Sequence, residues 1–326
     1  MLRVAFAGIS ILALSLGACA TMTPAATETA APAQPAVAAA AAPAAKPAPA
    51  LEDKYATSAD GTKIHYVASG QGPLVVMIHG FPDYWGSWSK LIPTLNDSYR
   101  TIAIDTRGYN LSDKPQGVAN YAMPKLVEDI DAVIQAEGRQ KATVVGHDWG
   151  AAIAWNYAFA HMDKLDNLII MSVPHPANFG RQLTNSPQNS DYARNFQKEG
   201  SEKNLTAEGL AGWVQDPEMK PKYVEAFKKS DFAAMMNYYR ANYPVGDNAP
   251  STLLPPNFPK IAVPLLVIHG MKDQALLSAG HNDTWDQAAK DTTVLMIPTA
   301  NHFVQHDAAP LVNKTIRTWL DARRPS

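Results

Sequence analysis

Six short runs of almost uninterrupted apolar residues recur along the chain, and each ends in turn-forming residues. A strand needs such a run when helices cover both of its faces, because neither face then meets water. Helix-like stretches, including residues 123–137 and 150–160, fall between the runs. This alternation predicts an α/β fold in which helices wrap a mostly parallel, doubly wound sheet. The runs are residues 74–78, 100–104, 142–145, 168–171, 265–268 and 293–297.

The alternation of strands and helices stops between residues 177 and 258. This stretch is rich in Asn, Gln, Lys, Tyr and Met and shows no convincing strand pattern. Helix-like segments occur around residues 191–198, 206–214 and 221–239. We therefore expect a helical cap over residues 177–258, inserted after the sixth strand of a core that spans residues 51–176 and 259–326.

The first residues have the layout of a secretory signal peptide. A basic start with Arg3 is followed by an apolar run over residues 4–16, which is too short to span a membrane, and by small residues before Cys19. Leu-Gly-Ala-Cys at residues 16–19 resembles the lipobox of bacterial lipoproteins, in which the leader is cut before a cysteine that then carries lipid. We expect residues 1–19 to be such a leader. An ordinary signal peptide, with Cys19 incidental, is the alternative.

Residues 20–50 are predicted to be a linker, since 16 of these 31 residues are Ala and 6 are Pro. Proline at this density interrupts helices, and the segment holds nothing large enough to form a core. With a lipid on Cys19, we expect the protein to be anchored in the bacterial cell envelope and to face the periplasm. Ala20 rather than Asp follows the cysteine, which favours the outer membrane.

The overall charge excludes one class of partner. The chain has 28 Lys and Arg residues against 30 Asp and Glu residues, a formal net charge of −2, and no basic stretch. Nucleic-acid binding needs cations gathered on one face to neutralise phosphates, so we expect no nucleic-acid partner. A single cysteine also excludes an intramolecular disulfide.

The sequence Gly-His-Asp-Trp-Gly at residues 146–150 lies directly between the predicted strand 142–145 and a predicted helix. A reactive residue flanked by glycines at a strand-to-helix turn is typical of a nucleophile elbow, in which the glycines permit the tight turn. The spacing alone is not specific, but here strand, turn and helix follow one another in the required order. Asp148 is therefore the candidate nucleophile.

An elbow nucleophile needs an acid and then a histidine further along the chain. Asp273 lies just past the predicted strand 265–268, and His302 lies in the loop after the strand 293–297. We predict that His302 is the base and that Asp273 orients it. His306 is the competing base, but it lies four residues further on, where we expect the protein surface.

The loop after the strand 74–78 has the sequence His-Gly-Phe-Pro. We expect the backbone N–H groups of Phe81 and Trp149 to point into the crevice above the sheet and to form an oxyanion hole. Apolar candidates for the wall of a ligand pocket are Phe81, Trp85, Met235 and Met236.

Six motifs occur in order along the chain, namely HGFP, DTRGYNLSDKP, GHDWGA, VPHP, GMKD and NHFVQ. With these motifs, the chain from about Lys54 to Trp319 resembles the α/β-hydrolase superfamily and, within it, the epoxide hydrolases. Two cap segments extend the resemblance: YARNFQ, which begins at Tyr192, and NYYR, which contains Tyr238 and Tyr239. The resemblance implies that Tyr192 and Tyr239 are the ring-opening tyrosines, with Tyr238 as the alternative to Tyr239.

A carboxylate nucleophile constrains the reaction. Asp148 suits displacement at saturated carbon and would leave an alkyl ester on the enzyme. Water activated by His302 would hydrolyse this ester, while the oxyanion hole stabilises charge on the ester carbonyl. A departing epoxide oxygen needs a proton donor, for which the phenols of Tyr192 and Tyr239 are suitable. We thus predict an enzyme that opens small apolar epoxides to vicinal diols.

Two other functions are compatible with parts of this pattern. A haloalkane-type dehalogenase would use the same Asp-His-Asp triad and the indole N–H of Trp149, but such enzymes typically carry a polar residue at the position of Phe81. A protein that only binds could keep the fold, but it would not need a carboxylate at a strained turn. Neither a metal-ligand cluster nor a dinucleotide-binding glycine pattern occurs, so we expect no metal and no cofactor.

Overall fold

The computed structural model describes residues 49–185, 187–243, 259–288 and 290–324, which belong to a unit that spans residues 47–326. The predicted leader, Cys19 and nearly all of the predicted linker lie outside the described residues. The last part of the predicted cap, residues 244–258, also lies outside them.

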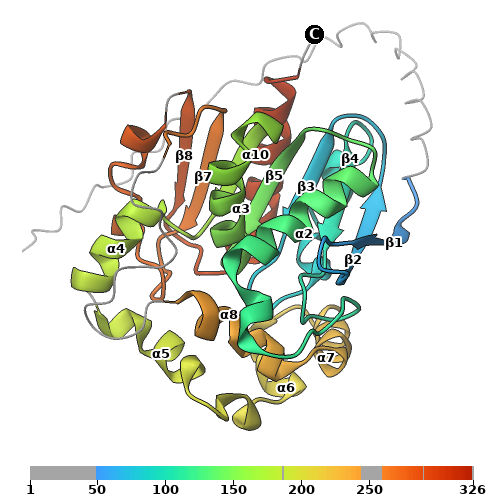
Figure 1. Ribbon diagram of the computed structural model, residues 1–326. Coiled ribbons are helices and arrows are strands. Elements are labelled where there is room, and N and C mark those ends of the chain that lie inside the picture. The colour runs from blue at the N-terminus through green and yellow to red at the C-terminus, as the bar shows by residue number, and fades with distance from the viewer. Residues whose placement is uncertain (1–48, 186, 244–258, 289, 325–326) are drawn as a thin grey trace, which may run out of the picture. The chain divides into compact units, whose positions relative to one another are not determined.

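One eight-stranded sheet organises the described part of the chain (Figure 1). Its strands follow the order β1-β2-β4-β3-β5-β6-β7-β8, with antiparallel pairing of β1 to β2 and of β2 to β4 and parallel pairing elsewhere. The strands are β1 Glu52–Thr57, β2 Lys63–Ser69, β3 Leu74–Ile78, β4 Arg100–Ile104, β5 Ala142–His147, β6 Leu165–Met171, β7 Leu265–Gly270 and β8 Thr292–Ile297. This mostly parallel sheet confirms the predicted fold class.

Every predicted apolar run lies within one of the strands β3 to β8, whereas β1 was not predicted. β1 lies at an edge of the sheet, and most of its side chains are exposed. Its residues Glu52, Asp53 and Lys54 break any apolar pattern, which is why the sequence carries no strand signal there.

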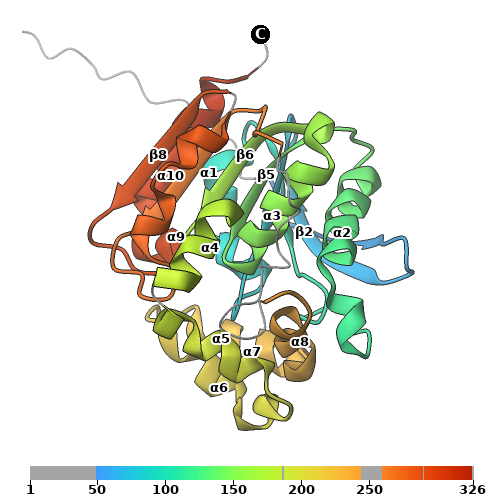
Figure 2. The same ribbon diagram turned by 60° about the vertical axis from the view of Figure 1, so that its left-hand side comes forward.

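Helices cover the sheet on both faces, as Figures 1 and 2 show. The helices of the core are α1 Ile92–Leu95, α2 Met123–Ala136, α3 Trp149–Ala160, α9 Val304–Asp307 and α10 Ala309–Asp321. Val76 and Ile78 of β3 pack in the same layer as α2 and α3, whereas Val75 and Met77 pack in the layer of α1 and α10. Successive residues of a strand therefore pack into opposite helical layers. Because both layers are apolar, every residue of the run must be apolar.

The cap lies between β6 and β7 in the sequence and consists of helices in its described part (Figure 2). Its α-helices are α4 Pro176–Asn185, α5 Asp191–Gln197, α6 Ala207–Leu210, α7 Lys220–Lys229 and α8 Phe232–Asn242. The predicted segment 221–239 is two helices instead of one. Asp231 ends the continuity because its side chain accepts a hydrogen bond from the N–H of Ala234 at 3.1 Å and so caps α8.

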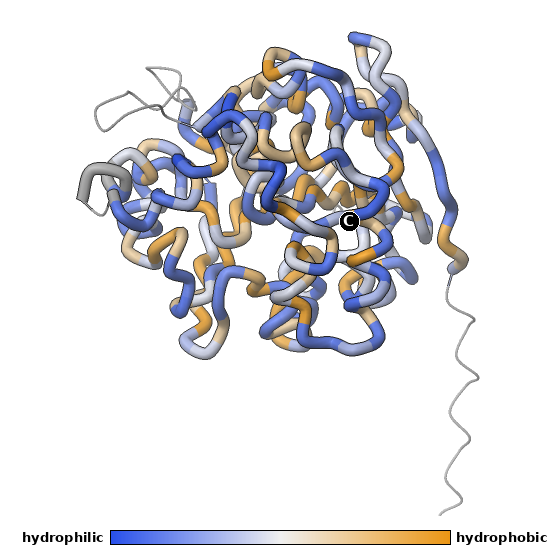
Figure 3. The backbone as a smooth tube through the Cα atoms, turned by 90° about the horizontal axis from the view of Figure 1, so that it is seen from below, coloured by the Kyte–Doolittle hydropathy of each residue, from blue (hydrophilic) through white to orange (hydrophobic). Residues whose placement is uncertain are grey.

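Viewed from the cap side, hydrophobic and hydrophilic stretches alternate along the backbone (Figure 3). Cap and core are joined by an aromatic stack between Trp213, just after α6, and Phe303, just before α9. The two ring centroids are 3.6 Å apart and the rings are nearly parallel. Within the described ranges, no helix is both long and apolar enough to cross a membrane.

Candidate active site

Asp148 occupies the turn between β5 and α3 with a backbone φ of 52° and ψ of −123°. Non-glycine residues rarely adopt a positive φ, so the surroundings must impose this conformation. Neighbouring atoms lie at very close range. A Cβ atom on Gly150 would lie 2.0 Å from the carbonyl oxygen of Ile78, and one on Gly80 would lie 2.3 Å from the Cβ atom of Asp148. The glycines therefore make room for the turn and for the carboxylate.

Three loops at the carboxyl ends of β5, β7 and β8 bring the predicted triad together. The Nε2 atom of His302 lies 3.4 Å from Oδ2 of Asp148, and its Nδ1 atom lies 2.7 Å from Oδ2 of Asp273. The other oxygen of Asp273 accepts hydrogen bonds from the N–H groups of Ala275 and Leu276, both at 2.9 Å. These two bonds fix the carboxylate that orients the imidazole.

The charges of the triad stabilise one another. Burial opposes ionisation of Asp148, but His302 and the N–H of Phe81 outweigh burial and lower the pKa of this carboxyl. Burial likewise opposes ionisation of Asp273, yet its contacts with His302 lower its pKa. Burial also disfavours a charged His302, but the hydrogen bonds to Asp148 and Asp273 raise its pKa to about 10.

One predicted oxyanion donor contacts the nucleophile directly. The backbone N–H of Phe81 donates a hydrogen bond of 2.7 Å to Oδ1 of Asp148. Trp149, the second predicted donor, is the first residue of α3, where backbone N–H groups have no acceptor within the helix. With Oδ1 held by Phe81, Oδ2 is the oxygen available for attack.

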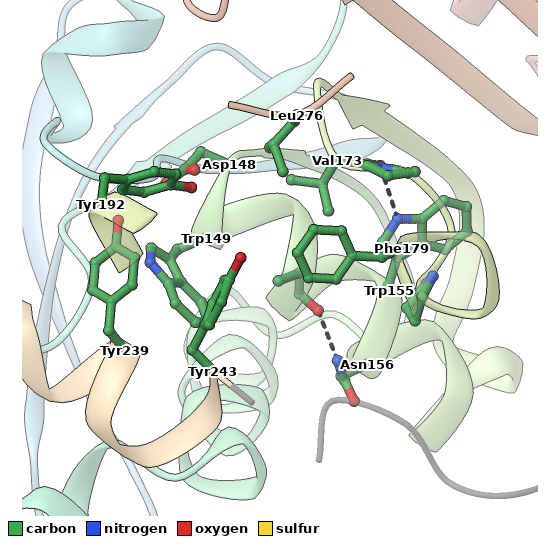
Figure 4. Close-up of a pocket in the computed structure, with 13 residues that line it drawn as sticks. Asp148, Trp149, Trp155, Asn156, Val173, Phe179, Tyr192, Tyr239, Tyr243 and Leu276 are labelled. Atoms are coloured by element: carbon green, nitrogen blue, oxygen red, sulfur yellow. Dashed lines mark hydrogen bonds between the residues drawn. The ribbon is translucent and has the colours of Figure 1, made fainter. Parts of the chain in front are cut away.

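Two cap tyrosines face the nucleophile. Tyr192 of α5 and Tyr239 of α8 line the same cavity as Asp148, and their ring centroids are 6.2 Å apart (Figure 4). Burial, with Asp148 nearby, holds the pKa values of both phenols well above the usual range, so both carry their protons at neutral pH. Tyr238 lies elsewhere, because its hydroxyl donates to the carbonyl oxygen of Arg107 at 2.8 Å in the core.

A cavity of about 40 Å³ lies beside Asp148. Its lining residues are Asp148, Trp149, Ala152, Trp155, Asn156, Val173, Pro174, Pro176, Phe179, Tyr192, Tyr239, Tyr243 and Leu276. None of the four predicted wall residues is among them. Met235 and Met236 are fully buried in the core instead. The apolar spacing of Trp149, Ala152 and Trp155 along α3 is the signal that could have indicated this wall.

Two further groups hold the loop of His302, and the sequence reasoning missed both roles. The Nε2 atom of His147 lies 2.9 Å from the carbonyl oxygen of His302, and the hydroxyl of Ser172 donates to the same oxygen at 2.8 Å. Burial, together with the nearby charge of His302, lowers the pKa of His147 to about 4, so its ring is neutral and donates from Nε2. The position of His147 next to the nucleophile was the available signal.

We expected His306 to lie at the surface, but its side chain is mostly buried. Its Nε2 atom is 3.1 Å from the hydroxyl of Ser87, 3.2 Å from the hydroxyl of Tyr223 and 3.7 Å from the buried carboxylate of Asp83. Tyr223 belongs to the cap, so the cap covers this histidine. The contacts hold its ring at Asp83 and leave His302 as the histidine at Asp148.

No group of three or more His, Cys, Asp or Glu residues is placed to hold a metal ion in the parts of the chain that the structure describes. Two other histidines there, His269 and His281, form a buried pair, with Nδ1 of His269 3.0 Å from Nε2 of His281. Burial lowers the pKa values of both, so the pair is neutral.

Comparison with known proteins places this site in a family. Residues 73–309 match the family described as alpha/beta hydrolase fold. The chain therefore belongs to the α/β-hydrolase family. Within this family its relatives include epoxide hydrolase 1 of Caenorhabditis elegans, 32% identical over 79% of this chain and 68% of that protein, and epoxide hydrolase 3 of Xenopus tropicalis, 33% identical over 80% and 75%.

A third relative and a solved structure support the same family. The AB hydrolase superfamily protein YfhM of Bacillus subtilis is 33% identical over 81% of this chain and 96% of its own length. A crystal structure of the Bacillus megaterium epoxide hydrolase with an inhibitor superposes with a TM-score of 0.76, at 30% identity over 82% of this chain and 100% of that chain. The chain thus groups with the epoxide hydrolases.

Proposed function

We propose that this protein hydrolyses epoxides to vicinal diols through a covalent ester on Asp148. The observation that carries the proposal is the placement of two protonated phenols, Tyr192 and Tyr239, around a carboxylate at a nucleophile elbow. A carboxylate displaces leaving groups at saturated carbon, and an epoxide oxygen leaves as a basic alkoxide that needs a proton. The relatives named epoxide hydrolases support the same reaction.

In the first step, Oδ2 of Asp148 attacks one ring carbon of the epoxide. The carbon–oxygen bond of the ring breaks, and the departing oxygen accepts hydrogen bonds from Tyr192 and Tyr239, one of which supplies the proton. The other carboxylate oxygen, Oδ1, becomes the ester carbonyl and stays on the N–H of Phe81. The cap therefore supplies the acid and the core supplies the nucleophile.

In the second step, water attacks the carbonyl carbon of the ester. His302 takes a proton from this water, and Asp273 stabilises the imidazolium that forms. The negative charge that develops on Oδ1 meets the N–H of Phe81, which is already in place at 2.7 Å. Collapse of this intermediate passes the second proton of the water to the departing alcohol oxygen, which releases the diol and restores the carboxylate of Asp148. The proton that His302 releases when the ester forms replaces the one that the tyrosine gave to the epoxide oxygen.

The test is the turnover of 1,2-epoxyhexane and of 1-chlorohexane by the full-length protein and by Asp148→Asn. We expect diol from the epoxide, loss of this activity in the variant, and no comparable chloride release. Asparagine keeps the size of the side chain but is a far weaker nucleophile. Chloride release without diol formation would replace the proposal with a dehalogenase, and unchanged epoxide turnover by Asp148→Asn would exclude the ester mechanism.

We further propose that the protein is a bacterial lipoprotein with lipid on Cys19, facing the periplasm and preferably in the outer membrane. The support comes from sequence: Cys19 is the only cysteine, and it follows an apolar leader at the position where lipidation requires it. The Ala- and Pro-rich residues 20–50 would then separate the hydrolase from the membrane surface.

A further inference from the structure

The cavity at Asp148 extends along α3. Ala152 and Asn156 follow the nucleophile at successive helical turns, and both line the cavity. At a rise of 1.5 Å per residue, the distance along the helix from Trp149 to Asn156 is about 10 Å. We call the part of the cavity that is lined by α3 and α4 the arm, and the labelled residues in Figure 4 show how its lining extends away from Asp148.

The wall of this arm is apolar. Among its described lining residues, Asp148 alone carries a charge, and it lies at one end. Tyr243 contributes its ring, because its hydroxyl donates to the hydroxyl of Ser190 at 2.7 Å. Phe179, whose ring centroid is 6.0 Å from that of Tyr243, closes the wall opposite α3. An apolar chain gains free energy here by leaving water, whereas a polar chain finds few partners.

Another side of the nucleophile is filled by aromatic rings. The rings of Phe81, Phe196 and Tyr239 are in mutual contact, with centroids 5.1 to 5.6 Å apart. Tyr239 of this cluster lines the cavity together with Asp148, and the backbone N–H of Phe81 binds Oδ1 of the same carboxylate, so the cluster borders the cavity at the nucleophile. A substituent on the second ring carbon of an epoxide would have to displace these rings.

We propose that the substrate is a terminal epoxide with a single apolar arm, bound with its oxirane at Asp148 and its arm along α3 toward Asn156. The proposal rests on the proposed function and specifies its substrate class. With a carbon–carbon bond of about 1.5 Å, an arm of about 10 Å accommodates roughly six to eight carbon atoms. Phe196 and its neighbours exclude a second substituent, and Ala152 is the point at which the arm can be blocked.

The first experiment compares 1,2-epoxyoctane with trans-2,3-epoxyoctane, using the purified full-length protein. We expect kcat/KM to be at least about tenfold higher for the terminal isomer, a difference typical of one misplaced carbon in a hydrophobic pocket. Phe196→Ala should reduce this ratio, because it opens the side filled by aromatic rings. Phe232→Ala, a matched change in the cap outside the cavity lining, should leave the ratio unchanged.

The second experiment blocks the arm. Ala152→Leu should lower kcat/KM for 1,2-epoxyoctane about tenfold or more, while 1,2-epoxypropane, which has no arm to accommodate, stays within about threefold. Retained turnover of epoxypropane also shows that the variant folds. Equal rates on the two epoxyoctanes, or an equal loss on long and short epoxides in Ala152→Leu, would overturn the substrate class and leave epoxide hydrolysis standing. No turnover of any epoxide by the wild type would overturn both proposals.

Discussion

His302 lies between two carboxylates, and this position determines the charge of the resting site. Asp148 and Asp273 keep the proton on the imidazole, so at neutral pH a cation lies between two anions. When Asp148 becomes an ester, one of the anions is lost and the pKa of His302 falls. The step that forms the ester therefore also prepares the base that hydrolyses it.

Replacing Asp148 by Asn imitates this loss of charge without adding bulk. We expect the pKa of His302 to fall from about 10, because the imidazolium loses one ion-pair partner while burial still opposes its charge. An NMR titration of the imidazole in the wild type and in Asp148→Asn measures the change. A pKa that stays the same in the variant would show that Asp148 does not stabilise the imidazolium.

His302→Gln separates the two half-reactions. Because His302 is the base of the hydrolytic step in the proposed mechanism, the variant should open one equivalent of epoxide and then stop as an ester on Asp148. Intact-protein mass spectrometry should show a mass increase equal to the mass of the epoxide. The matched control is Asp148→Asn, which should gain no mass. A variant that stays unmodified by an epoxide that the wild type hydrolyses would contradict the two-step scheme.

In the proposed mechanism, the phenols of Tyr192 and Tyr239 act when oxygen departs. Removing one donor in Tyr239→Phe or Tyr192→Phe should slow ring opening about ten- to a thousandfold, by analogy with the loss of one oxyanion-hole donor. Single-turnover measurements on the epoxide report this step, and the double variant reports the coupling between the two phenols. Rates close to that of the wild type in both single variants would assign proton donation to another group.

The meeting of Asp148, Asp273 and His302 could be predicted because each of them follows a strongly apolar strand. Parallel strands end at the same edge of a sheet, so residues distant in sequence meet there. The cavity wall could not be predicted in the same way. Phe179 and Tyr243 reach the cavity only through the placement of the cap, and the choice between Tyr238 and Tyr239 depends on which face of α8 contacts the core.

At the scale of elements, the β5–α3 turn tolerates no side chain at its glycines. Gly150→Ala places a Cβ atom 2.0 Å from the carbonyl oxygen of Ile78, and backbone cannot move as a flexible side chain can. We expect the free energy of unfolding to fall by about 2 kcal/mol or more. Urea denaturation measures it. Gly212→Ala, at an exposed glycine with no atom within 4 Å of the added carbon, should change it by less than about 1 kcal/mol.

The sequence indicated the ends of the buried strands better than the ends of the cap helices. β3 and β4 were predicted at their observed ends, because burial on both faces demands an uninterrupted apolar run. The break between α7 and α8 was missed because it depends on a single polar cap. Asp231 closes α8 with its side chain, and its N–H donates to the carbonyl oxygen of Gly108 in the core at 3.0 Å, a tertiary contact that periodicity does not reveal.

At the scale of the whole molecule, the proposed lipid on Cys19 decides where the enzyme works. Cys19→Ser should leave the leader uncleaved or release the protein from the membrane fraction, because serine cannot form the thioether to lipid. Fractionation and intact mass of the full-length protein measure both. Membrane association and mass that match those of the wild type would rule out lipidation at this position.

The turn that carries Asp148 depends on three residues without side chains, since a Cβ atom on Gly80, Gly146 or Gly150 would lie 2.0 to 2.3 Å from another atom. The three glycines therefore leave the space that the turn and the side chain of Asp148 occupy. In evolutionary terms, a residue at position 148 must tolerate the positive φ of this turn, whereas a side chain at any of the three glycines would fill the space that the turn needs.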